Sequence, residues 1–181
     1  MRVAPLQPDE WNDDVINALS DMVTPDRLER RDPGTALATL ARHPRLTHAF
    51  LRFNGYLLLD SELPPRLREL AILRVAHRRD CAYEWTHHVQ IGTRAGLTAE
   101  IIEGVTRGEA ADALDQAILA AVDELEENSN ISDATWAALS EHLDEHQRMD
   151  LVFTIGSYGL LAMAFNTFGV QIDDDNEQQE R

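Results

Sequence analysis

The sequence predicts an all-α fold, and three observations support this prediction. Apolar residues recur at helical spacing along most of the chain. No run of alternating apolar and polar residues is bounded by hairpin turns, as strands would require. Proline, glycine and capping residues divide the chain into segments of helix length. We expect one domain over residues 1–172, because 181 residues with 44% hydrophobic content can bury a core. Residues 173–181 are strongly acidic and are expected to form a frayed, disordered tail.

The N-terminal third is expected to contain three helices separated by short breaks. They cover residues 11–22, 35–42 and 45–59, and Thr24, Pro25 and Asp26 are expected to break the first helix. Asp9 or Asn12 can cap the free amides at the start of the first helix. Pro44 fits the first turn of the third helix, where its missing N–H removes no hydrogen bond. Residues 27–31, which are rich in arginine, are expected to form a loop.

Two helices are expected in the middle of the chain. The string SELPP is a helix-start signal in which Ser61 or Leu63 precedes two prolines, and apolar residues at helical spacing follow it. Residues 78–80 interrupt this pattern. A second helix is then expected over residues 80–94, with Gly96 after it as a left-handed cap.

Four further helices are expected in the C-terminal half. They cover residues 98–104, 111–126, 133–142 and 145–168. The last one includes Leu151–Val170, a stretch of 20 uncharged residues that is long enough to span a bilayer. We favour a helix buried in the core or at a subunit interface. The stretch contains three glycines, and aspartates rather than anchoring lysines or arginines follow it.

Charge and cysteine content exclude several kinds of function. The chain has 32 acidic and 16 basic residues, a formal net charge of −16, so we expect neither a nucleic-acid nor a membrane partner. All basic residues are arginines, which excludes Schiff-base catalysis by a lysine. Cys81 is the only cysteine, so no intrachain disulfide can form, and we expect a cytoplasmic location.

The expected helix over residues 80–94 carries the residues best suited to chemistry. At about 100° per residue, Cys81, Glu84 and His88 share one face, and Trp85 borders it. A carboxylate and an imidazole on successive turns can exchange protons, and an indole beside a carboxyl raises its pKa. Any amphipathic helix also brings such residues together. The alternative is therefore a structural histidine beside a solvated glutamate.

The string RLRELAILRVAHRRDCAYEWTHHVQIGTRAGLTAEIIEGV resembles the carboxymuconolactone decarboxylase family. The alkylhydroperoxidase D branch of that family carries Glu, eleven residues, Cys, two residues, Cys, three residues and His. Glu69, Cys81 and His88 match three of these positions, but Glu84 stands at the second cysteine. The YEW string, the histidine and the following AGLT resemble the decarboxylase side of the family instead.

The resemblance implies an alkylhydroperoxidase D-like helical bundle that assembles as a homo-trimer or homo-hexamer, with the uncharged last helix at an interface. It also implies an enzyme of decarboxylase type that performs acid–base chemistry on a small lactone or carbonyl metabolite. Glu84 and His88 would then handle protons, and Glu69 would orient His88 or hold a relay water.

The substrate of such an enzyme is expected to contact aromatic and basic side chains near this motif. Trp85 and Tyr83 are the aromatic candidates. An anionic substrate would need a cation, which Arg74, Arg78 or Arg79 could supply. We expect no metal and no other cofactor, because the sequence has no HExxH spacing and no glycine-rich phosphate loop.

Two alternative functions follow from the same residues. The first is a thiol-dependent alkylhydroperoxidase or peroxiredoxin-like activity through Cys81. In the peroxidase branch the second cysteine attacks peroxide and the first closes a disulfide with it, so this chain lacks the attacking thiol. A single thiol could still pass through a sulfenic acid and be recycled by an external thiol. The second alternative is a non-catalytic helical protein that binds a ligand or assembles.

Overall fold

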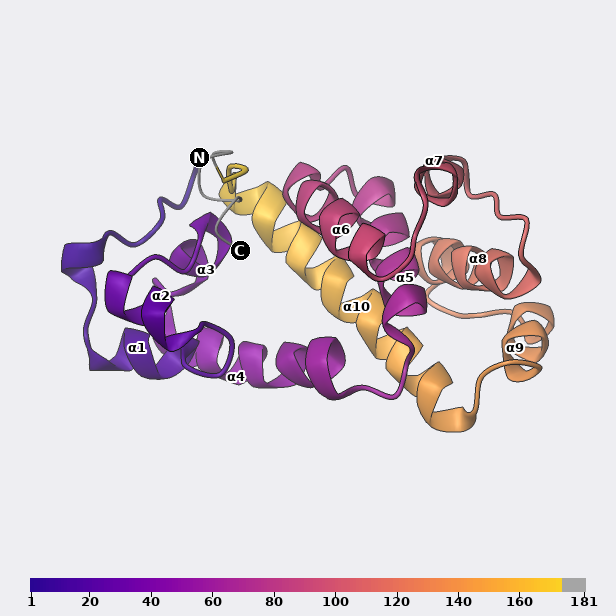
Figure 1. Cartoon of the computed structure of the whole chain (residues 1–181), viewed down its shortest axis with the longest axis horizontal. Coiled ribbons are helices and arrows are strands. Elements are labelled where there is room, and N and C mark those ends of the chain that lie inside the picture. The colour runs from indigo at the N-terminus through magenta and orange to yellow at the C-terminus, as the bar shows by residue number, and fades with distance from the viewer. Residues whose placement is uncertain (174–181) are drawn as a thin grey trace. The chain divides into compact units, whose positions relative to one another are not determined.

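Every regular element in the computed structural model, which describes residues 1–173, is a helix (Figure 1). In chain order they are η1 (Pro8–Glu10), α1 (Asp13–Leu19), α2 (Pro25–Arg30), α3 (Thr35–Leu40), α4 (Pro44–Gly55), η2 (Tyr56–Asp60), α5 (Pro65–Arg78), α6 (Ala82–Arg94), α7 (Ala99–Arg107), α8 (Ala113–Asn128), α9 (Asp133–Ser140) and α10 (Glu145–Phe168). The all-α prediction is confirmed. From residue 174 onward, the expected acidic tail lies outside the described residues.

The chain divides into two compact units. Unit 1 consists of Met1–Asp60 together with the residues from Ala164 onward, and unit 2 is Ser61–Met163. The division falls within α10, so the last turn of that helix belongs to unit 1. The single domain expected over residues 1–172 stays a prediction.

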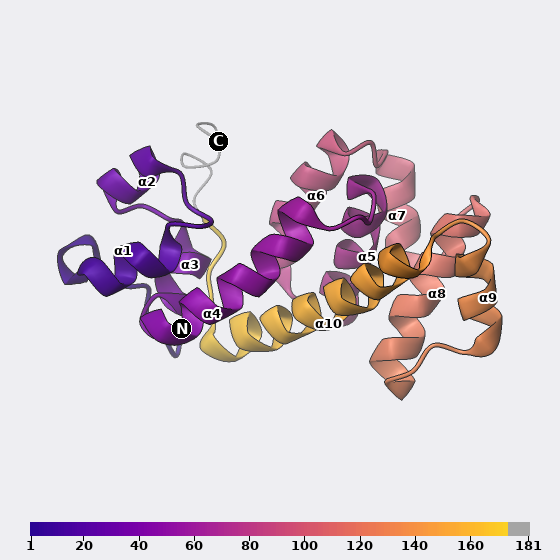
Figure 2. The ribbon, with the colours of Figure 1, turned by 90° about the horizontal axis from the view of Figure 1, so that it is seen from below.

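In unit 1, α1 packs against α4 (Figures 1 and 2). The core of this unit consists of Trp11, Val15, Leu19, Val23, Ala41 and Leu51. The Asn12 side chain accepts a hydrogen bond from the Val15 N–H at 3.1 Å and so caps α1. Asn12 is one of the two residues that were expected to cap this helix. The loop expected over residues 27–31 is wrong, because α2 occupies Pro25–Arg30. Pro25, which was expected only to break the first helix, also starts the next one at its first turn.

Asp173 belongs to the ordered part of unit 1. It is 4% exposed, and its Oδ1 accepts a hydrogen bond from the backbone N–H of Thr35 at 2.8 Å. Thr35 is the first residue of α3, whose own N-cap, Gly34, has no side chain with which to cap it. Asp173, which was expected to be the first residue of the frayed tail, is therefore ordered and performs the capping role.

In unit 2, α5 packs against α6, α7 and α8, and α9 packs against α8 (Figure 2). Ten residues of α5 are buried, so this helix is the centre of the unit. The chain reverses after α5 through a left-handed residue, Asp80, whose φ is 49°. The Asp80 N–H donates to the His77 carbonyl at 3.2 Å, and the Cys81 N–H donates to the Ala76 carbonyl at 2.9 Å. These two bonds form the Schellman motif that ends α5.

Two helix boundaries in unit 2 differ from those expected. Helix α6 begins at Ala82, so Cys81 is its N-cap residue with extended backbone and does not lie on a helix face. Helix α7 continues past Gly104 to Arg107, and Gly108 ends it in a left-handed conformation. Gly96 follows α6 with a φ of 100°, as expected for a left-handed cap.

By length and composition alone, α10 could cross a membrane. It is the one helix of the described chain with this property, and 50% of its 18-residue apolar window is buried inside the structure. The core helix of a soluble protein passes the same test, and Leu151, Ile155 and Ala162 are almost completely buried here. We therefore describe α10 as a packed helix.

Candidate active site

Glu69 of α5 and His88 of α6 form a buried hydrogen-bonded pair. The distance from Glu69 Oε2 to His88 Nδ1 is 2.6 Å. Glu69 is fully buried, and His88 is 8% exposed. An ionised carboxylate can only accept hydrogen bonds, so Nδ1 must carry the hydrogen of this contact. In the neutral imidazole, Nε2 is then the nitrogen with a free lone pair.

Gly92 explains how α6 comes close enough to α5 for this pair to form. It lies one turn after His88 on α6. A Cβ atom at this position would lie 2.9 Å from Leu97 Cδ1, 3.4 Å from Leu73 Cδ1 and 3.6 Å from Glu69 Cβ. The absence of a side chain at Gly92 therefore permits the close approach at the level of Glu69.

Arg68 is the second partner of Glu69. Its Nε donates to Glu69 Oε1 at 3.1 Å, so the two oxygens of this carboxylate contact different groups. Arg68 is 9% exposed. The sequence-based prediction did not include Arg68. An adjacent Arg–Glu pair inside an otherwise apolar helical pattern was the available signal, because such charges are rarely buried unless they are paired.

Tyr158 of α10 also contacts the imidazole of His88. The ring centroids of His88 and Tyr158 are 5.0 Å apart and their planes are perpendicular. Tyr158 is 3% exposed. His88 is thus held by a hydrogen bond from α5 and by an edge-to-face ring contact from α10. No signal in the sequence linked Tyr158 to the motif.

Glu84 is a buried carboxyl group on α6, one turn before His88. Neither of its oxygens has a hydrogen-bond partner among the described residues, and the group is 2% exposed. Burial raises its pKa to about 8, although the nearby Cys81 thiol and the Arg79 charge act in the opposite direction. At pH 7 the group is therefore mainly the neutral acid, a form that can donate a proton.

Cys81 is buried as a protonated thiol. It is 1% exposed. Burial, followed by the negative charge of Glu84, raises its pKa to about 12. The thiolate is the nucleophilic form of cysteine, and this environment opposes its formation.

A pocket of 370 Å³ lies beside Cys81. Its lining residues are Ala76, His77, Asp80, Cys81, Ala82, Trp85, Thr86 and Thr106. The rings of His77 and Trp85 form its aromatic wall, with centroids 5.9 Å apart. Glu69, Glu84 and His88 do not line this pocket. The structure thus places Trp85 with Cys81 at the pocket, and Glu69 with His88 in the buried pair.

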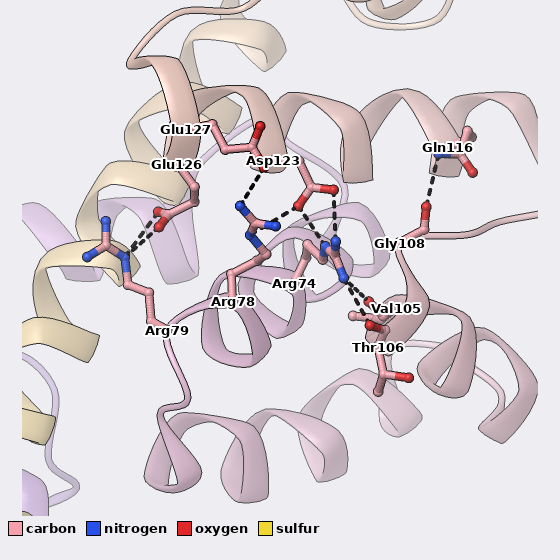
Figure 3. Close-up of polar contacts among 10 residues, drawn as sticks. All are labelled: Arg74, Arg78, Arg79, Val105, Thr106, Gly108, Gln116, Asp123, Glu126 and Glu127. Atoms are coloured by element: carbon pink, nitrogen blue, oxygen red, sulfur yellow. Dashed lines mark hydrogen bonds and ion pairs between the residues drawn. The ribbon is translucent and has the colours of Figure 1, made fainter.

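The guanidinium of Arg74, which was expected to contact the substrate, is bonded inside the protein. Its Nε and Nη2 donate to the two Asp123 oxygens, each at 2.8 Å, and its Nη1 donates to the Val105 and Thr106 carbonyls at 2.7 and 3.2 Å (Figure 3). These internal partners engage the buried guanidinium and join α5 to α7 and α8. The expected contact of Arg74 with a substrate stays a prediction.

The other two candidate arginines also face acids of α8 (Figure 3). Arg78 Nη2 lies 2.8 Å from Glu127 Oε1, and Arg79 Nε lies 2.8 Å from Glu126 Oε2. Tyr83, expected to contact the substrate, stacks on His87 with ring centroids 4.1 Å apart. Within residues 1–173, no group of three His, Cys, Asp or Glu side chains is placed to hold a metal ion.

The fold and this site together define an all-helical protein with a carboxylate–imidazole pair buried between two neighbouring helices. The model of the Carboxymuconolactone decarboxylase family matches residues 44–127, which extend from α4 into α8 and include the whole pair. This match supports a family-level relationship between the chain and the carboxymuconolactone decarboxylases. No curated protein matches the sequence.

Solved structures share the fold over most of their length. The alkylhydroperoxidase AhpD core, an uncharacterized peroxidase-related protein from Ralstonia eutropha JMP134, has a TM-score of 0.80 at 20% identity and covers 96% of this chain and 93% of its own. The debrominase Bmp8 has a TM-score of 0.74 at 16% identity, with coverages of 97% and 94%. An uncharacterized peroxidase-related protein from Silicibacter sp. TM1040 has a TM-score of 0.72 at 17% identity, with coverages of 86% and 84%. At these identities the likeness shows a common AhpD-like fold. It does not show that the proteins catalyse the same reaction.

Proposed function

We propose that the protein is an acid–base enzyme of the decarboxylase type that acts on a small lactone or carbonyl metabolite. The observation that carries this proposal is the 2.6 Å contact between Glu69 Oε2 and His88 Nδ1. A buried carboxylate that binds Nδ1–H fixes the ring orientation and the tautomer, and leaves Nε2 to accept a proton from a substrate.

Glu84 is the proton donor in this proposal. When CO₂ leaves a lactone acid or an oxo acid, the electron pair of the broken C–C bond remains on the carbon next to the carbonyl group. A proton must then be delivered to that carbon. A carboxyl group with its pKa raised to about 8 holds such a proton at neutral pH.

A small molecule is the expected substrate. The debrominase Bmp8, as its C82A variant, forms a complex with 2,3,4-tribromopyrrole. A small planar ligand in this fold supports a small-molecule substrate for the present chain, while the reaction of Bmp8 itself is not carried over.

The experiment is a screen of small lactone acids and oxo acids in D₂O that follows CO₂ release and deuterium uptake by NMR. His88→Asn and Glu69→Gln are expected to lower kcat by about 10²–10⁴-fold, the usual contribution of a positioned acid or base. Arg94→Gln, at an exposed position near the end of α6, is the control and should retain activity. Turnover that survives both His88→Asn and Glu69→Gln would refute the proposal.

A thiol peroxidase is the second candidate, because two structures with the same fold are described as peroxidase-related. The buried thiol of Cys81, with its pKa raised to about 12, opposes this function. Peroxide consumption with a dithiol reductant separates the two candidates. We expect the wild type to show no peroxidase activity that depends on Cys81. Peroxidase activity that is present in the wild type and lost in Cys81→Ser would favour the second candidate.

A further inference from the structure

Arg68 is a buried cation that the protein itself only partly satisfies. Its Nε donates to Glu69 Oε1 at 3.1 Å, and no other hydrogen bond or ion pair of Arg68 is found among the described residues. The side chain is 11% exposed. Its two amino nitrogens have no partner among the described residues and are not completely sealed from solvent. Burying a charge without full pairing is unfavourable because the charge loses its hydration, so this arrangement requires an explanation.

The other three arginines of α5 use their amino nitrogens internally. Arg66 makes a two-bond contact with Asp115 at 2.7 and 2.6 Å. Arg74 pairs with Asp123, and Arg78 pairs with Glu127. All three acids lie on α8. Arg68 is thus the arginine of α5 whose amino edge has no carboxylate from the described chain.

We propose that Arg68 binds a carboxylate group of the substrate through its two Nη atoms. The planar guanidinium offers two parallel N–H donors that match the two oxygens of a carboxylate. Glu69 occupies Nε and leaves the amino edge for a second acceptor. Glu69 also contacts His88. A carboxylate bound to the Nη atoms of Arg68 would therefore be separated from the imidazole only by the Glu69 side chain.

This inference specifies the substrate as a small carboxylic acid, and for the role of His88 it rests on the proposed function. It also supplies the cation that Arg74, Arg78 and Arg79 do not offer, since those guanidinium groups face acids of α8. In a chain with a net charge of −16, an anionic substrate needs such a local cation.

The test measures binding rather than turnover. Two probes, 4-oxopentanoate and its uncharged methyl ester, are titrated against the full chain by ligand-observed NMR. The wild type is expected to bind the acid at least tenfold more tightly than the ester, since only the acid can pair with the guanidinium. Arg68→Gln should remove this preference, whereas Arg94→Gln, which removes the same charge from an exposed site, should keep it.

Equal affinity of the wild type for acid and ester would overturn the proposal, and so would an acid preference that survives in Arg68→Gln. Arg68→Lys is the second variant, in case Arg68→Gln does not fold. Lysine keeps the positive charge but lacks the two parallel N–H donors of the guanidinium, so we expect three- to tenfold weaker binding of the acid. Unchanged affinity for the acid would contradict the two-donor contact. His88→Asn should keep the acid preference while losing turnover. A failure of the carboxylate site is thereby distinguished from a failure of the proposed reaction.

Discussion

Burial acts on two neighbouring titratable side chains at the start of α6, with different chemical results. The Cys81 thiol and the Glu84 carboxyl both have a raised pKa, because both are taken out of water. For the carboxyl group this produces a proton donor near neutral pH. For the thiol it removes the nucleophile. The exchange of the second motif cysteine for Glu84 thus changes the available chemistry of the whole motif.

The thiol of Cys81 should react slowly with alkylating agents. A rise of its pKa from 9 to about 12 lowers the thiolate fraction at pH 8 by about 10³-fold, and burial adds steric protection. We therefore expect iodoacetamide to modify the native protein at least about 100 times more slowly than the chain in 6 M guanidinium chloride. Mass spectrometry of timed samples measures both rates. Similar rates in the two conditions would show an accessible, ionisable thiol.

Glu84 should make the protein less stable as the pH rises. Its carboxyl pKa is 4.5 in the unfolded chain and about 8 in the fold, so the folded state retains a proton that the unfolded state releases. The free energy of unfolding should fall by up to about 1.4 kcal/mol per pH unit between about pH 5 and 8, relative to Glu84→Gln. Urea unfolding of both proteins at pH 5, 6.5 and 8 measures this difference. A difference that does not change with pH would mean that Glu84 has an ordinary pKa.

The motif residues could be identified from the sequence, but their partners could not. The spacing of Glu69, Cys81 and His88 in the family motif pointed to a segment within the residues that the family model matches. The contact of His88 with Tyr158 joins residues 70 positions apart and depends on how α10 packs. The orientation of Arg74 toward Asp123 depends in the same way on the packing of α8. Spacing along one helix contains no information about either contact.

At the scale of secondary structure, helical periodicity predicted most helices. The helix boundaries that were predicted wrongly depend on local turn geometry. Thr24 and Pro25 were expected to break a helix, but Pro25 also begins α2. Cys81 was expected on the face of α6 but precedes it, because the Schellman motif requires two residues outside the helices. Such boundaries depend on single backbone hydrogen bonds, which periodicity does not detect.

Two helical glycines in unit 2 should respond in opposite ways to alanine. At Gly104 a Cβ atom would lie 2.4 Å from the backbone oxygen of Glu109, so Gly104→Ala must displace the end of α7. We expect a loss of at least about 2 kcal/mol in the free energy of unfolding, as for other overpacked sites. Urea unfolding at pH 7 measures it.

Gly156→Ala is the matched control within one copy of the chain, since a Cβ atom at Gly156 would meet nothing of that copy within 4 Å. Alanine there should stabilise α10 by up to about 1 kcal/mol, because glycine is the poorer helix former. Equal effects of the two substitutions would contradict the packing described around Gly104.

At the scale of the whole molecule, α10 combines a buried face with an exposed apolar face. Met149, Leu160 and Met163 are 51%, 52% and 49% exposed. Their spacing places them on one side of the helix, within and beside the uncharged stretch Leu151–Val170. In a chain with a net charge of −16, this stretch is a region where two copies do not repel each other. We propose that copies of the chain associate through this face of α10.

Light scattering after gel filtration should therefore give a mass near three or six times 20.4 kDa. Leu160→Glu, which introduces a charge on the apolar face, should reduce this mass, whereas Arg94→Gln should not change it. A wild-type protein that elutes only as a 20.4 kDa monomer would contradict the assembly.

The central claim is that Glu69 fixes His88 as a proton-transfer group, and the protonation of the His88 ring tests it most directly. The measurement is ¹⁵N NMR of histidine-labelled protein between pH 6 and 9, with His88→Asn used to assign the signals. The Glu69–His88 contact predicts a proton on Nδ1 and a free lone pair on Nε2 in the neutral ring, and Glu69→Gln should remove this preference. A neutral His88 that carries its proton on Nε2, or that is unaffected by Glu69→Gln, would contradict the account.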